Sequence, residues 1–155
     1  RSVLVATFAL DTGEGARALF GGLAARLAAT PELRVTLYVN IHRRHQDDTP
    51  AAALVAEFAG RFAHDVWPGK RLPEVLYDPR SVDPEGNKRA VLHAKCVVVD
   101  DRWTFLTSAN FTEAAQERNI EAGVVVDDPR IAERVGRQFE RLAEAGALRR
   151  LSLKR

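Results

Sequence analysis

The sequence lacks the features that mark disulfide-rich, membrane-spanning and secreted proteins. Its one cysteine, Cys96, lies inside an apolar run, which excludes a disulfide framework and favours a reducing compartment, so we expect a cytoplasmic protein. No stretch approaches the roughly 18 apolar residues of a membrane-spanning helix, and no signal peptide opens the chain. The chain starts at Arg1 and not at Met, directly before an apolar run, so we expect a fragment of a longer protein.

What remains is the composition of an ordinary globular domain. The 155 residues are 46% hydrophobic and 28% charged, which suits a single domain over residues 1–155 with a core that needs no structural metal. The net charge of +2 and the pI of about 9.0 favour an anionic partner only weakly. The sequence has no internal repeats.

The hydrophobic pattern predicts alternating strands and helices. Apolar runs predict strands over residues 2–10, 33–41 and 73–78, and apolar residues at helical spacing predict helices over 14–30 and 50–67. A last helix is expected after Asp127 and Asp128, ending near Gly146, and the tail 147–155 is expected to form an edge strand or to fray. The order strand, helix, strand predicts an α/β fold.

Residues 91–121 combine polar side chains with an apolar strand pattern. Residues 91–100 and 103–108 predict two strands joined by a two-residue turn at Asp101 and Arg102. Residues whose numbers sum to 203 would then lie opposite each other, with directly opposed Cβ atoms roughly 5 Å apart.

This register brings four polar side chains together at one end of the hairpin. Lys95 would face Ser108, and His93 would face Asn110 just past the strand end. The set suits a phosphoryl group, because Lys supplies positive charge, Ser and Asn supply neutral donors, and a neutral imidazole can attack phosphorus. We expect no metal and no other cofactor, since the carboxylate cluster that holds Mg²⁺ is absent here.

A nucleophilic histidine needs a carboxylate to fix its tautomer. Asp100 lies seven residues along the same predicted strand as His93, about 23 Å away. Glu121 is the better candidate, because it heads the apolar strand predicted over residues 119–126 and a carboxylate in that position needs a partner.

Some of these residues also have simpler explanations. A histidine and a lysine at a strand end are more often plain surface residues. His42, Arg43 and Arg44 follow the second predicted strand, where open α/β sheets bind ligands, but such clusters are usually solvated loops.

Two weaker motifs point elsewhere. Residues 13–18 resemble a dinucleotide fingerprint, yet Asn40 stands where the acidic ribose ligand belongs, so an ordinary glycine-rich turn is preferred. A zinc site at His42 and His45 lacks nearby residues to complete it.

The spacing of the central residues is similar to a family motif. The run His93-x-Lys95-x4-Asp100-x6-Thr107-Ser108-x-Asn110 resembles the HxKx4Dx6GSxN motif of the phospholipase D superfamily, and Glu121 also matches its pattern. One departure is Thr107, which replaces the glycine of the motif. Residues 91–126 most resemble the phospholipase-D-like component of bacterial DISARM phage-defence systems, and next the small single-motif nucleases.

The resemblance implies a fold and a set of roles. The fold would be a mixed, largely parallel sheet sandwiched between helices, one half of a two-motif unit. His93 would form a phosphohistidine intermediate, Lys95 and Asn110 would bind phosphate oxygens, and Ser108 would assist. Glu121 would orient His93, and Asp100 would have a structural role.

The resemblance also implies partners. The family uses two such motifs and this chain has one, so we expect a homodimer that brings two His93 side chains to one phosphate. The expected activity is a metal-independent phosphodiesterase, a nuclease in anti-phage defence that works with other defence subunits. His42, Arg43, Arg44, Lys88 and Arg89 would contact nucleic acid. The alternatives are a phospholipase or phosphatidyltransferase, and an inactive nucleic-acid-binding or scaffold subunit.

Overall fold

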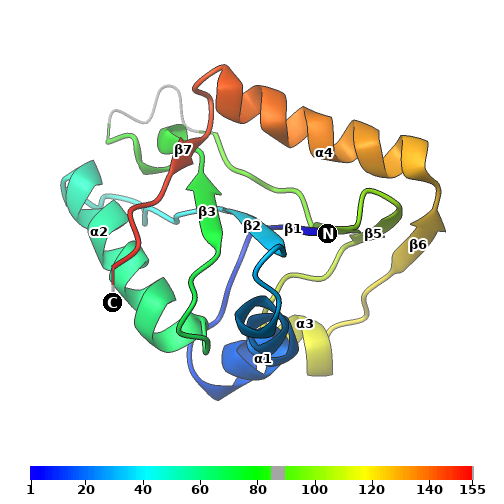
Figure 1. Cartoon of the computed structure of the whole chain (residues 1–155). Helices are drawn as coiled ribbons and strands as arrows, with labels where there is room; N and C mark the ends of the chain where they lie inside the picture. The colour runs from blue at the N-terminus through cyan, green and yellow to red at the C-terminus, as the bar shows by residue number, and fades with distance from the viewer. Residues whose placement is uncertain (85–89, 155) are drawn as a thin grey trace.

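A mixed sheet with the strand order β6-β5-β4-β1-β2-β3-β7 runs through the computed structural model, which describes residues 1–84 and 90–154 (Figure 1). The three central strands that run parallel are β1 (Ser2–Thr7), β2 (Arg34–Val39) and β3 (Glu74–Tyr77). The remaining strands, which pair antiparallel with their neighbours, are β4 (Cys96–Val99), β5 (Trp103–Thr107), β6 (Gly123–Asp127) and β7 (Arg149–Arg150).

Helices cover both faces of this sheet. Two helices, α1 (Glu14–Ala29) and α2 (Ala51–Arg61), share one hydrophobic cluster with β1, β2 and β3 on one face. A π-helical turn, η1 (Phe62–Val66), extends α2. On the other face, α4 (Pro129–Glu144) packs Phe139 against Tyr38, with ring centroids 4.5 Å apart. A 3-10 turn, η2 (Pro79–Val82), follows β3, and a short helix, α3 (Glu113–Glu117), lies between β5 and β6.

The predicted α/β fold is confirmed. The mixed sheet between helices is present, although among the named strands of the described residues only β1–β2 and β2–β3 pair parallel and the other pairings are antiparallel. Asp128 caps α4 by accepting a hydrogen bond from the backbone N–H of Arg130 at 2.8 Å, and Gly146, with a φ of 73°, follows its end. Within the tail, β7 is the edge strand that pairs with β3.

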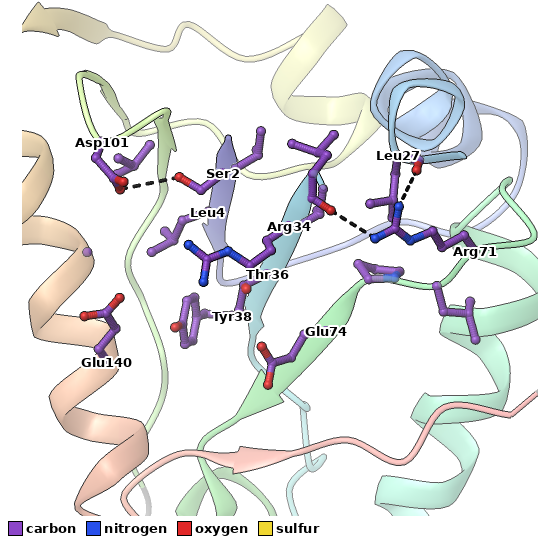
Figure 2. A pocket seen from close by; sticks show the side chains of 17 residues that line it. Ser2, Leu4, Leu27, Arg34, Thr36, Tyr38, Arg71, Glu74, Asp101 and Glu140 are labelled. Carbon is purple, nitrogen blue, oxygen red and sulfur yellow. Dashed lines mark hydrogen bonds between the residues drawn. The ribbon is translucent and has the colours of Figure 1, made fainter. Parts of the chain in front are cut away.

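One arginine joins the end of α1 to the loop before β3. The guanidinium of Arg71 donates to the carbonyl oxygens of Leu27 and Thr30 at 2.9 Å, of Pro31 at 2.9 Å and of Leu33 at 3.1 Å. Figure 2 shows this guanidinium beside the end of α1. A cation at this end of a helix satisfies carbonyls that have no partner within the helix and complements the helix dipole.

The β4–β5 hairpin differs from its prediction by one residue. The turn centres on Asp100 and Asp101, with φ values of 53° and 51°, and the N–H of Arg102 donates to the Val99 carbonyl at 3.1 Å. Val99 therefore lies opposite Trp103, so the predicted register is wrong. The physical reason is that this turn needs two residues with positive φ, which Asp adopts more readily than Arg.

The predicted strand over residues 91–100 is too long. β4 begins only at Cys96, and residues 91–95 approach it as an irregular segment. Lys95 lies beside Thr107, whose N–H donates to the Lys95 carbonyl at 3.2 Å, so the expected pairing of Lys95 with Ser108 is wrong.

Candidate active site

His93 and Lys95 lie side by side on the irregular segment before β4. The Lys95 Nζ is 3.2 Å from both ring nitrogens of His93, and the His93 side chain is exposed. An ammonium can only donate and a neutral imidazole offers one lone pair, so the two equal distances bring the side chains together without showing which nitrogen accepts. A neutral ring is the form that can attack phosphorus.

Asn110 is fixed by the backbone that extends β1. Its Oδ1 accepts a hydrogen bond from the N–H of Ala9 at 3.2 Å, while the N–H of Phe111 donates to the Ala9 carbonyl at 3.2 Å. Since the carboxamide oxygen is held by β1, its NH₂ group is left to donate to a ligand. Asn110 and His93 thus reach the same end of the sheet from different segments.

Ser108 and Glu121 bind each other. The Ser108 Oγ donates to one oxygen of Glu121 and accepts from the N–H of Ala122 at 3.1 Å. The other Glu121 oxygen accepts from the Nδ2 of Asn119 at 3.1 Å. The hydrogen bonds from Ser108 and Asn119, with a smaller contribution from the charge of Lys95, lower the pKa of Glu121.

These contacts revise two expectations about Glu121. It precedes β6, which begins at Gly123, so it does not head a strand. Its hydrogen-bond partners are Ser108 and Asn119, whereas the neighbour of the His93 imidazole is Lys95. The hydroxyl of Ser108 donates its proton to the Glu121 carboxylate, so that proton is not available to a substrate. The hydroxyl instead holds Glu121 in place.

Asp100 follows β4, at the opposite end of this strand from His93 and Lys95. Its Oδ1 accepts from the N–H of Ser2 at 2.9 Å, and its own N–H donates to the Ser2 carbonyl at 2.9 Å. These two hydrogen bonds join the hairpin turn to the start of β1, which is a structural role.

The basic loop after β2 divides into one buried and two exposed side chains. Arg43 is buried, and its guanidinium donates to the Val82 carbonyl at 3.0 and 2.8 Å and to the Asp47 carbonyl. Its expected role as a substrate contact is therefore wrong, because a buried guanidinium needs these carbonyls as partners. Lys88 and Arg89, the other expected contacts, lie outside the described residues.

His42 and Arg44 remain at the surface on either side of Arg43. Together with Arg61 of α2 they line a polar cavity of about 370 Å³ that also contains Asp47 and Glu57. The buried guanidinium of Arg43 holds this loop against η2, so the two exposed side chains project from a fixed backbone.

A second polar cleft lies beneath α4, at the end of β1 where the chain enters the strand (Figure 2). It measures about 400 Å³, and Arg34, Tyr38, Glu74 and Glu140 are among its lining residues. Burial, with the nearby charges of Glu74 and Glu140, raises the pKa of Tyr38 to about 12. Neither His93 nor Lys95 lines it, so this cleft is separate from the candidate active site.

Phe8 also lies beside His93 and Lys95, although the sequence did not predict it as part of the site. The ring of Phe8 lies 4.7 Å from the His93 ring between centroids, with an interplanar angle of 54°. No sequence signal singles it out, because it is an apolar residue at the end of an apolar strand pattern.

Comparisons with known proteins show what this chain is similar to. Residues 70–143 match the family described as "Cardiolipin synthase, PLD-like domain", and this stretch holds the whole of the motif that resembles the phospholipase D superfamily. Curated protein sequences yield no match.

Solved structures show the same fold. Nuc from Salmonella typhimurium, a phospholipase D family member, aligns with a TM-score of 0.60 and 20% identity over 99% of this chain and 82% of its own. NucT from Helicobacter pylori aligns at 0.57 and 18% identity over 92% and 79%. Phosphatidylserine synthase from Haemophilus influenzae Rd KW20 aligns at 0.58 and 16% identity over 97% of this chain and 34% of its own.

The same fold is therefore found in a phospholipase D family member and in a phosphatidylserine synthase. In the described part of the present chain, no helix is both long and apolar enough to cross a bilayer.

Proposed function

We propose that the chain is a metal-independent phosphodiesterase that cleaves nucleic acid through a covalent bond to His93. The observation that carries this proposal is the exposed imidazole of His93 with the Lys95 ammonium 3.2 Å from its nitrogens. The direct test is cleavage of single- and double-stranded DNA with EDTA present. Absence of any EDTA-resistant cleavage would reject the proposal.

The reaction has two steps. A lone pair on a His93 nitrogen attacks phosphorus, the bond from phosphorus to the leaving oxygen breaks, and that oxygen takes a proton from a second imidazole. Water then attacks phosphorus, gives its proton to that second imidazole, and the phosphorus–nitrogen bond breaks. Lys95 and the NH₂ group of Asn110 would bind the non-bridging oxygens.

The second imidazole would come from a second copy of the chain. Within the described residues, the ring nitrogens of His93 have Lys95 as their neighbour and not another histidine. Large exposed apolar side chains also lie on β5, β6 and the segment that enters β6, divided between the two faces of this edge of the sheet, and exposed apolar surface favours a protein partner. They are Trp103, Phe105, Leu106, Ile120, Val124 and Val125.

Mixing active and inactive chains tests this dimer. If both imidazoles are required, a fixed amount of wild-type chain should keep about half of its activity after exchange with one equivalent of His93→Ala chain, and about a third with two equivalents. Sedimentation should show a dimer that Val125→Glu dissociates and that Leu19→Glu, at an exposed site on α1, leaves intact. Undiminished activity after full exchange, or an active monomer, would contradict the shared site.

The exposed basic residues beside α2 would hold a second phosphate of a polynucleotide. In the His93→Ala background, which separates binding from cleavage, Arg44→Ala with Arg61→Ala should weaken DNA binding and lower the slope of log K against log salt by about 1 to 2. The matched control is Arg134→Ala, an exposed cation on α4 across the sheet. An unchanged salt slope would show that these side chains do not contact phosphate.

A lipid substrate is the second candidate. It is favoured by the matched family, whose description names cardiolipin synthase, and by the likeness to a phosphatidylserine synthase. Assays on anionic phospholipid vesicles and on DNA, with the same preparation, discriminate between the two. Turnover of vesicles alone would replace the nuclease proposal.

The biological setting that we propose is bacterial anti-phage defence, with other defence subunits as partners. Its support is the similarity of residues 91–126 to the phospholipase-D-like component of DISARM systems. If the chain served only as a scaffold, His93→Ala in the complete system would leave the plating efficiency of phage unchanged.

A further inference from the structure

Phe8 lies in the candidate active site, although it is apolar and follows β1 directly. Besides its contact with His93, its ring centroid is 5.7 Å from the Lys95 Nζ, which itself lies 3.2 Å from both His93 nitrogens. The three side chains therefore form a closed set in which each contacts the other two. An ammonium within about 6 Å of an aromatic centroid is attracted to the ring.

The packing of Phe8 is directed toward this set. Phe8 is half-buried, yet it is in neither of the two hydrophobic clusters that fill the described parts of the core. A phenyl ring at a strand end usually joins such a cluster. The ring of Phe8 therefore packs against His93 and Lys95 and not within these clusters.

The backbone on both sides of Phe8 is fixed. The Oγ1 of Thr7 accepts from the N–H of Phe111 at 3.3 Å, and the N–H of Ala9 donates to the Oδ1 of Asn110 at 3.2 Å. Phe8 therefore stands between two residues that hold the segment carrying Asn110. The backbone that carries the Phe8 ring is therefore held by hydrogen bonds on both sides.

The imidazole of His93 needs a neighbour that fixes its orientation, because the segment that carries it has no regular secondary structure. Residues 91–95 are outside any strand, and the Glu121 carboxylate binds Ser108 and Asn119. A nucleophile acts efficiently only when the reacting atoms are held close to the attack geometry, and a displacement of 1 Å can cost about 10²-fold in rate.

We propose that Phe8 is a positioning residue, which holds the imidazole of His93 and the ammonium of Lys95 in the geometry for attack on phosphorus. The inference rests on the proposed phosphodiesterase function. It assigns to an aromatic ring the orienting role that a carboxylate was expected to have.

The kinetic test uses a graded set of variants. Phe8→Ala should lower kcat by roughly 10- to 100-fold with KM within about twofold, because the defect is in orientation and not in binding. Phe8→Tyr, which keeps the ring, should restore most of kcat, and Phe8→Leu should fall between them. Val91→Ala, a truncation of an exposed apolar side chain on the same segment, should behave as wild type. Full kcat in Phe8→Ala, or a Phe8→Tyr variant as poor as Phe8→Ala, would overturn the proposal.

A second measurement does not depend on activity. The ring current of Phe8 should displace the proton resonances of the His93 imidazole in wild type, and Phe8→Leu should return them toward the values of a free histidine side chain while the thermal midpoint stays near that of wild type. If wild type lacked phosphodiesterase activity but showed this displacement, the proposed function would fail while the contact stood. An undisplaced imidazole in wild type would overturn the positioning role itself.

Discussion

His93→Ala is expected to abolish EDTA-resistant cleavage of DNA, with a fall in rate of about 10⁴-fold or more, because the variant lacks the atom that bonds to phosphorus. The exposed side chain of His93 is not part of the core, so the fold should persist. The matched control is His64→Ala, which removes an exposed imidazole from η1 and should leave the rate unchanged.

The covalent intermediate gives this prediction a second readout. A substrate with labelled phosphate, quenched in alkali because phosphohistidine is labile in acid, should leave label on wild type and none on His93→Ala. Label on another residue, or equal EDTA-resistant rates for both proteins, would remove His93 from the nucleophile's role.

Trp67→Ala is expected to lower the free energy of unfolding by about 3–5 kcal/mol, the cost of a large cavity in a well-packed core. Trp67 is 0% exposed, and its ring centroid lies 5.6 Å from that of Phe20 and 6.4 Å from that of Phe62. Its Nε1–H donates to the Arg71 carbonyl at 2.9 Å, so the ring also holds the residue that binds the end of α1.

Trp67→Phe separates the two contributions. It keeps an aromatic ring but leaves the Arg71 carbonyl without its donor, so the expected loss is smaller, about 1–3 kcal/mol. Urea denaturation followed by circular dichroism measures both variants, with Leu19→Ala on the exposed side of α1 as the control. A loss below about 1 kcal/mol for Trp67→Ala would show that this part of the core collapses around the missing ring.

Much of the fold could be predicted from the sequence, because hydrophobic periodicity and end signals agree over most elements. Pro129 and Asp128 marked the start of α4, and Gly146 its end. The proximity of His93 and Lys95 was also predictable from their spacing, since residues two apart in extended chain share a face.

The finer geometry of the site could not be predicted, because a shift of one residue in the β4–β5 register changes which side chains lie opposite each other. Placing the turn one residue too late moved every cross-strand pair, which is why Lys95 was matched to Ser108 instead of Thr107. Phe8 carries no polar group, so only its tertiary contact with His93 reveals it. The hydrogen bonds of Glu121 with the hydroxyl of Ser108 and the carboxamide of Asn119 likewise depend on tertiary structure.

Three consecutive residues at the end of β1 each hold a different part of the candidate site. Thr7 binds the backbone of Phe111, Phe8 contacts His93, and Ala9 binds the carboxamide of Asn110. The nucleophile and the phosphate-binding amide are thus aligned to one common reference, although they come from segments that follow β1 by more than eighty residues. Local melting of this short segment would release both together, so heat should inactivate the protein before its sheet unfolds.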